Sequence, residues 1–256
     1  MAQKGYFQDQ DDDRVIRPGL RSRRQVLAIA SVMLLGMVVV IPPLIQRSRG
    51  TGEVQIRCPN TLKMIGLALH NYAEAHDAFP PAYTVDANGR RLHSWRTLIL
   101  PFMSQPEIYE KLDLSKPWDA PENRKALRMP NRYFHCSVSD LPRTQTTFLA
   151  IVTPDSLIQE TSSRPYSAAK GPLAKTVMVI EADEDHAVHW ASPYDVDENV
   201  LMSFDEDSRV SHSKGMHILL ADGSVLKVSD DMPASERRKL IAPSEEPDLF
   251  SDQSVQ

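Results

Sequence analysis

The stretch CPNTLKMIGLALHNYAEAHDAFPP, from Cys58 to Pro81, predicts a helix with a single apolar face. Its apolar side chains recur at spacings of three and four residues, at Leu62, Ile65, Leu69, Tyr72 and Ala73. Pro59 suits the first helical position, where a backbone N–H has no partner within the helix, and Pro80-Pro81 end the pattern. One face of this helix is therefore expected to pack against the rest of a domain.

The segments toward the C-terminus predict strands. TVMVIEAD predicts a buried strand over Thr176–Glu181, and MHILLADGSVLKVS predicts a hairpin that turns at Asp222-Gly223. TTFLAIV, Thr146 to Val152, and YFHC, Tyr133 to Cys136, are further strand candidates. No βαβ series alternates along the chain, so the predicted fold class is α+β, with the amphipathic helix packed on an antiparallel sheet.

Short elements are expected between the helix and these strands. SWRTLILPFM, from Ser94 to Met103, predicts a strand or a short helix that ends near Pro101. PEIYEKLDLSKPWDAPENRKAL predicts two short polar helices joined at Lys116-Pro117, which Pro106 and Pro121 are suited to open.

Upstream of the helix, the run VLAIASVMLLGMVVVIPPLI, Val26 to Ile45, predicts a membrane anchor. It carries no charge, and a helix of about 20 residues crosses a hydrocarbon core of roughly 30 Å. Arginines stand at both ends, at Arg21, Arg23, Arg24, Arg47 and Arg49. The run is longer than the roughly 7–15 apolar residues of a cleaved signal peptide. A single uncleaved transmembrane helix, a signal anchor, is therefore expected.

The basic residues around this run favour one orientation. More arginines precede it than follow it, which places the N-terminus in the cytoplasm and exports the C-terminal domain. The expected organisation is a disordered cytoplasmic tail over 1–25, the transmembrane helix over 26–45, an exported α+β domain over 55–232 and a disordered acidic tail over 242–256.

Length and charge limit the function classes. The chain has 256 residues, which suits one ordinary domain plus an anchor. Its formal net charge is -5 and it contains no long basic block. Nucleic acid is therefore excluded as the main partner, because phosphate binding relies on clustered Lys and Arg.

Two cysteines, Cys58 and Cys136, stand far apart in the sequence and form no CxxC motif. In an exported domain they are candidates for one disulfide. Two buried free thiols are the alternative.

Several segments together resemble a pseudopilin-like family of unknown function that is expanded in planctomycete bacteria and is sometimes labelled solute-binding. The resemblance covers about Cys58 to Asp230. Its motifs occur in this order: CPNTLKMIGLALHNYAEAHDAFPPAY, SWRTLILPFM, IYEKLDLSKPWDAPEN, FHCSVSD and SHSKGMHILLADGSVLKVS. It implies a pilin-like fold and a structural role for Cys136, favours the disulfide, and implies no established activity.

The N-terminus departs from the pattern of that family. Typical members carry a prepilin leader, in which a glycine cleavage site precedes an apolar helix with Glu at its fifth position. Here Gly19 is followed by Leu20-Arg21-Ser22-Arg23-Arg24, with charge where the apolar helix should begin. Leader cleavage and assembly into a filament are therefore not expected.

Two groups of side chains are candidates for metal binding. The first is rich in histidine and carboxylate, ligands that suit zinc, but it lacks HExxH; its members are Glu181, Asp183, Asp185, His186, His189, His212, His217 and Asp222. The second is an acidic loop that offers weak calcium candidates without EF-hand spacing, at Asp195, Asp197, Asp205 and Asp207, with Glu198 and Glu206 nearby. A solvated acidic loop is the alternative for the second group.

A catalytic triad is not predicted. Ser211, His212 and Asp222 supply the residue types, yet no nucleophile-elbow motif surrounds them. Adjacent side chains on extended chain also point to opposite faces, which separates Ser211 from His212.

The sequence thus predicts a membrane-anchored, pseudopilin-like protein of the bacterial cell envelope. It is expected to have a structural or interaction role, envelope proteins as partners, no enzymatic activity, no catalytic residues and no cofactor. The rival hypotheses are an exported solute- or calcium-binding module and a metal-dependent hydrolase that uses the His and Asp cluster.

Overall fold

The computed structural model describes residues 58–136, 138–169, 171–212 and 215–241. They belong to one compact unit, Gly52–Gln256. The predicted anchor Val26–Ile45 and both predicted tails lie outside the described residues. Among the helices that are described, none combines the length and apolar character needed to cross a membrane.

The first described element is the long helix over residues 58–76. Its predicted apolar face is confirmed, because the side chains of Leu62, Ile65 and Leu69 are fully buried. A Cβ added to Gly66 would lie only 2.9 Å from Leu219 Cδ1, so the close contact between helix and sheet at this position depends on a residue without a side chain. The helix ends before Pro80-Pro81, at Asp77, whose φ of 57° is a common helix-terminating conformation.

The main sheet has four strands in the order β4-β5-β7-β8, and every neighbouring pair is antiparallel. The strands are β4 (Phe148–Ala150), β5 (Val177–Glu181), β7 (Met216–Leu220) and β8 (Val225–Val228). The predicted hairpin turn is confirmed between β7 and β8, where Gly223 has a φ of 85°. The antiparallel α+β fold class is confirmed with it.

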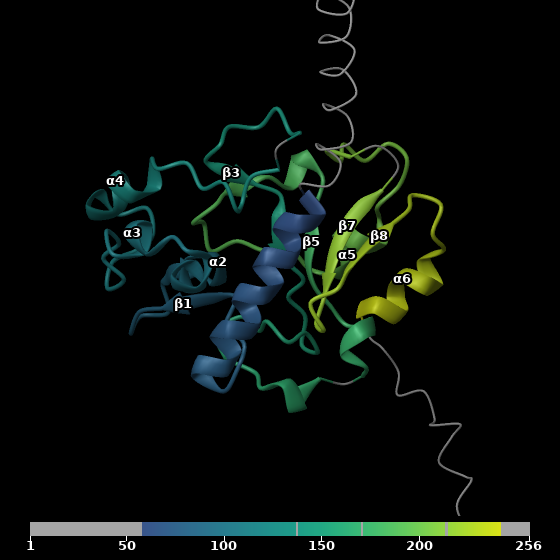
Figure 1. The fold of residues 1–256 in the computed structure, drawn as a ribbon, viewed down its shortest axis with the longest axis horizontal. Helices are drawn as coiled ribbons and strands as arrows, with labels where there is room; N and C mark the ends of the chain where they lie inside the picture. The colour runs from purple at the N-terminus through teal and green to yellow at the C-terminus, as the bar shows by residue number, and fades with distance from the viewer. Residues whose placement is uncertain (1–57, 137, 170, 213–214, 242–256) are drawn as a thin grey trace, which may run out of the picture. The chain divides into compact units, whose positions relative to one another are not determined.

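Both faces of this sheet are covered. In Figure 1 the helix over 58–76 lies on one side of β5 and β7, and its apolar stripe shares a core with Met178 and Leu219. On the other face Ile180 and Ile218 pack with α5 (Glu198–Met202) and α6 (Ala234–Ile241). Burial on both faces explains why every residue of β5 and β7 is buried and why most of them are apolar, Glu181 and His217 being the exceptions.

The helix α6 lies beyond residue 232, where the sequence analysis ended the domain. Its residue Arg237 is 5% exposed and donates hydrogen bonds from Nη1 to the carbonyl oxygens of Leu201, Met202 and Phe204. These carbonyls follow α5 or close its last turn, where backbone oxygens lack helical partners. A basic side chain that binds them therefore fixes α6 to α5.

The segment after the first helix forms short elements beside the main sheet. They are β1 (Tyr83–Val85), β2 (Arg91–Ser94), α2 (Trp95–Leu98), η1 (Leu100–Met103), α3 (Pro106–Tyr109), η2 (Pro121–Asn123) and α4 (Arg124–Leu127). Pro106 and Pro121 open elements as predicted. Of the two alternatives for SWRTLILPFM, the helical one is confirmed from Trp95 onward, but Pro101 lies in the first turn of η1 and does not end the segment. Ser94 caps α2 by accepting a hydrogen bond from the Arg96 amide.

The predicted strand YFHC is wrong, because residues 133–136 form turns and bends. This segment is held by side-chain contacts and not by the backbone hydrogen bonds of a strand. Phe134 is fully buried and its ring centroid lies 6.0 Å from that of Trp95 and 6.4 Å from that of Trp190. Apolar residues here anchor a loop to the core.

The remaining elements are short. They are β3 (Gln145–Thr146) paired with β6 (Val188–His189), and the turns η3 (Tyr166–Ala168), η4 (Leu173–Lys175) and η5 (Glu184–His186).

Candidate functional site

Five buried side chains meet where the first helix begins against the sheet, and they are called the Cys–His cluster: Cys58, Cys136, Glu181, His212 and His217. Cys58 is the first described residue of the helix, and Cys136 ends the loop anchored by Phe134. Ile180 pairs with Ile218, so Glu181 on β5 comes opposite His217 on β7. His212 comes from the bend before β7, so a helix, two loops and two strands contribute to one site.

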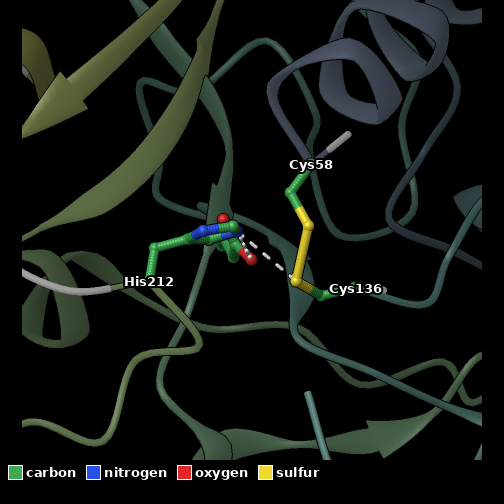
Figure 2. A group of neighbouring side chains, drawn as sticks. Cys58, Cys136 and His212 are labelled. Atoms are coloured by element: carbon green, nitrogen blue, oxygen red, sulfur yellow. Dashed lines mark hydrogen bonds and ion pairs between the residues drawn. A yellow bond between two sulfur atoms is a disulfide. The ribbon is translucent and has the colours of Figure 1, made fainter. Parts of the chain in front are cut away.

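A disulfide joins Cys58 to Cys136, with their Cα atoms 5.7 Å apart. Figure 2 shows the His212 side chain directed at this disulfide. His212 Nε2 lies 3.5 Å from Cys136 Sγ and 3.4 Å from Glu181 Oε1. His217 Nδ1 donates a hydrogen bond of 2.9 Å to the other carboxylate oxygen, Glu181 Oε2.

Glu181 is 1% exposed and sits between the two imidazoles. Burial alone would raise the pKa of its carboxyl, but hydrogen bonds and charge from His212 and His217 outweigh burial and hold the pKa below its ordinary value. The carboxylate is thus kept ionised. Its Oε1 atom has His212 Nε2 as its ion-pair partner at 3.4 Å and no closer hydrogen-bond donor among the described residues.

This lowered pKa predicts a pH dependence of stability. Because the folded-state pKa lies below the ordinary value of 4.5, the unfolded chain takes up the proton first as the pH falls. The contribution of Glu181 should be complete above about pH 4.5 and should be lost as the pH falls through the folded-state pKa. The measurement is the free energy of unfolding of wild type and Glu181→Gln from pH 7 to pH 3, and the difference between the two proteins should shrink as the pH falls.

The exposed carboxylate Glu110 provides the control for that comparison. The difference between wild type and Glu110→Gln should stay small across the same range. A gap between wild type and Glu181→Gln that widened toward pH 3 would contradict the stated direction.

Of the histidine- and carboxylate-rich group predicted from the sequence, the structure brings together Glu181, His212 and His217. The others are engaged elsewhere. Asp183 caps η5 and contacts His186, Asp185 pairs with Arg209, and Asp222 accepts hydrogen bonds within its own turn from Ser224. His189 lies against Trp118 and Trp190, with ring centroids 5.3 and 5.8 Å away.

The four calcium candidates are not gathered into a ligand group. Asp195 is paired with Arg96, Asp197 caps α5, and Asp205 and Asp207 belong to one exposed turn in which Asp205 accepts from the Asp207 amide and Ser208. Across the described parts of the chain, the set of His, Cys, Asp and Glu side chains close enough to hold an ion is Cys58, Cys136, Glu181 and His212. Calcium binding by the acidic loop stays a prediction.

The residue types of a triad are present but not assembled in the described structure. His212 directs Nε2 at Cys136 and Glu181, whereas Ser211 Oγ is buried without a hydrogen-bond partner among the described residues. Asp222 is occupied by Ser224 in the hairpin turn.

Sequence reasoning missed the second buried polar site, the ion pair between Arg96 and Asp195. Their side chains are 0% and 4% exposed, and Arg96 Nη1 lies 2.7 Å from Asp195 Oδ1. Asp195 Oδ1 also accepts from Trp95 Nε1 and the Ala150 amide. Burial raises the pKa of Asp195, and the Arg96 guanidinium opposes that rise. The signal in the sequence was an arginine inside the apolar segment SWRTLILPFM.

Arg96 uses every donor that a guanidinium has. Besides Asp195, it donates to the carbonyl oxygens of Trp190, Phe148, Ser192 and Tyr194 at 2.8–3.2 Å. The loop over 190–195 is therefore tied to α2 and β4 through one side chain. These contacts assign Arg96 a role in folding.

Comparison with known proteins identifies a family. No curated protein and no solved structure matched the chain. A family model described as "Protein of unknown function (DUF1559)", with the short name SBP_bac_10, matches residues 55–197, which is more than half of the chain. The matched region includes Cys58, Cys136 and Glu181 of the cluster and the pair Arg96–Asp195. The chain therefore belongs to the DUF1559 family of proteins of unknown function.

Proposed function

We propose that this chain is a membrane-anchored, pseudopilin-like protein of the bacterial cell envelope with a structural or interaction role. In this proposal Val26–Ile45 is the single anchor, the N-terminus is cytoplasmic and the domain that begins near Cys58 is exported. The protein is not an enzyme.

The disulfide between Cys58 and Cys136 carries the proposal. Disulfides persist in oxidising compartments such as the bacterial periplasm and are rare in the cytosol. Cys58 also follows the apolar run by only a short polar segment. A cross-link at the membrane-proximal start of the first helix would hold that helix to the body of the domain, where any pull from an anchor would act.

The packing of the first helix supports the pseudopilin-like part of the proposal. An N-terminal helix that buries one face against an antiparallel sheet is what the sequence resemblance implies for this family. The buried charges support a structural role, because Arg96 and Arg237 bind backbone carbonyls and so act within the fold.

Site-specific proteolysis tests the topology. The turn at Asn88-Gly89 is exposed, and Gly89 meets no other atom within 4 Å of an added Cβ. A recognition sequence for a specific protease inserted between these residues should be cut in bacterial spheroplasts by protease added outside. In the same sample, Cys58 and Cys136 should not react with an alkylating agent until a reductant is added.

The matched control is the same insertion in a chain that lacks residues 26–45. That protein should be cut only after the inner membrane is lysed, and its cysteines should be alkylated without reductant. Cleavage of the anchored chain only after lysis would overturn the proposed topology.

A surface hollow favours the alternative, an exported solute-binding module. It has a volume of about 670 Å³ and is lined by His70, Ala73, Glu74, Asp77, Pro165, Tyr166 and Ser167. Tyr166 Oη lies 2.7 Å from His70 Nδ1. Two carboxylates and a hydroxyl beside one another suit a small cationic solute. Native mass spectrometry of the chain isolated from its membrane would reveal such a solute as a defined added mass. A chain with no added mass would favour the structural role.

A further inference from the structure

We propose that the Cys–His cluster is a metal site in its reduced state, in which Cys58, Cys136, His212 and Glu181 bind one zinc ion. The disulfide and the bound ion are then alternative states of the same four side chains. This inference goes beyond the proposed function and does not rest on the anchor or on export.

The first argument for a zinc site is the set of distances from His212 Nε2 to the other ligand atoms. In a tetrahedral zinc site with bonds of about 2.0–2.3 Å, neighbouring ligand atoms stand about 3.3–3.8 Å apart. His212 Nε2 lies 3.4 Å from Glu181 Oε1 and 3.5 Å from Cys136 Sγ. The ligand atoms of all four residues lie within 4.8 Å of one another. The imidazole nitrogen thus already stands at tetrahedral separations from the carboxylate oxygen and from one sulfur.

The second argument for a zinc site is the burial of the four ligand side chains. Cys58, Cys136, Glu181 and His212 are all between 1% and 6% exposed. Glu181 Oε1 is buried, and its partner among the described residues is His212 Nε2, at the long distance of 3.4 Å. A cation bound between these two atoms would be a ligand partner for both. Unlike a group of exposed acids, these side chains are already held in place, because β5, the first helix and two loops position them.

The ligand types select the metal. Thiolate sulfur and imidazole nitrogen suit zinc and related transition metals, whereas calcium takes oxygen ligands. His217 is a supporting residue, because its hydrogen bond to Glu181 Oε2 orients the carboxylate while leaving Oε1 toward the other ligands.

The two states interconvert by balanced chemistry. A dithiol reductant transfers two electrons and two protons to the Cys58–Cys136 disulfide, the S–S bond breaks, and the reductant becomes a disulfide. Zinc binding then releases the two thiol protons as both sulfurs become thiolate ligands. Oxidation by a disulfide partner reverses the sequence and expels the ion. In both states the first helix stays tied to the loop at Cys136.

The test uses the full chain in detergent, with cobalt as a spectroscopic probe and zinc as its competitor. After reduction by a phosphine under anaerobic conditions, one Co²⁺ per chain should bind with thiolate-to-metal charge-transfer absorption, and zinc should displace it. The oxidised chain should bind neither ion. His212→Ala and Glu181→Gln should weaken zinc binding at least 100-fold and at least 10-fold, respectively.

The matched control is His189→Ala, which removes a half-buried histidine outside the cluster and should leave binding unchanged. Near-ultraviolet circular dichroism shows whether each variant is folded. If His212→Ala does not fold, Glu181→Gln still tests whether the cluster binds the ion. Equal binding by oxidised and reduced chain, no binding by the reduced chain, or equal affinity of Glu181→Gln and wild type would each overturn the proposal.

Discussion

Arg96→Ala is expected to lower the free energy of unfolding by about 3–5 kcal/mol, the cost of removing one partner of a buried ion pair. The change leaves the Asp195 carboxylate buried without its cation. It also removes the hydrogen bonds to the carbonyl oxygens of Trp190, Phe148, Ser192 and Tyr194. Domains are stable by only about 5–15 kcal/mol, so this loss is a large part of the margin. Urea denaturation followed by circular dichroism measures it.

An exposed arginine supplies the control. Arg90 stands 4.0 Å from Asp119, and both side chains are more than half exposed. Arg90→Ala should cost less than about 0.5 kcal/mol, because exposed pairs contribute little. The same chemical change at two sites thus separates the effect of burial from the effect of losing an arginine.

A double variant identifies the cause of the loss. Arg96→Met combined with Asp195→Asn should be more stable than Arg96→Met alone, because the second change removes the unpaired buried charge. Equal stability of single and double variants would show that the carbonyl contacts, rather than the ion pair, dominate the contribution of Arg96.

The elements that the sequence predicted well are those with local causes. The helix over 58–76 follows from its spacing of apolar residues, and the β7–β8 hairpin follows from Asp222-Gly223 between two apolar runs. In each case residues within one turn or one hairpin are sufficient, and distant packing only reinforces the local preference.

The features that were missed depend on distant partners. YFHC has strand-forming residues, but Phe134 packs between Trp95 and Trp190, so tertiary contact overrides local propensity. Arg96 finds its partners about a hundred residues away, in the loop over 190–195. No spacing rule connects positions so far apart.

The candidate site lies between these two cases. Residue types alone placed Glu181, His212 and His217 in one group, yet the same group held five acids and histidines that are engaged elsewhere, in a cap, a turn, an ion pair or ring packing. Strand register separates the two sets, because Glu181 and His217 face each other across β5 and β7. The disulfide then adds Cys58 and Cys136, which the sequence had treated apart from the histidines.

Loss of the disulfide is expected to have the other large effect. Cys58 and Cys136 are separated by 78 residues, and the chain-entropy relation for a loop of that length gives a stabilisation of about 4.5 kcal/mol. Cys58→Ala/Cys136→Ala should therefore lower the free energy of unfolding by about 2–5 kcal/mol, measured by denaturation in the presence of a metal chelator.

The reduced wild type separates the cross-link from the packing of the sulfur atoms. Reduction removes only the bond, so in chelator the reduced wild type should be destabilised by most of the same amount, and the remaining difference reports the two lost side-chain atoms. Added zinc should restore part of the stability of the reduced wild type through the energy of binding, and should leave the double alanine variant unchanged. If zinc stabilised both proteins equally, the ion would act elsewhere on the chain, and the two cysteines would serve the fold through the disulfide alone.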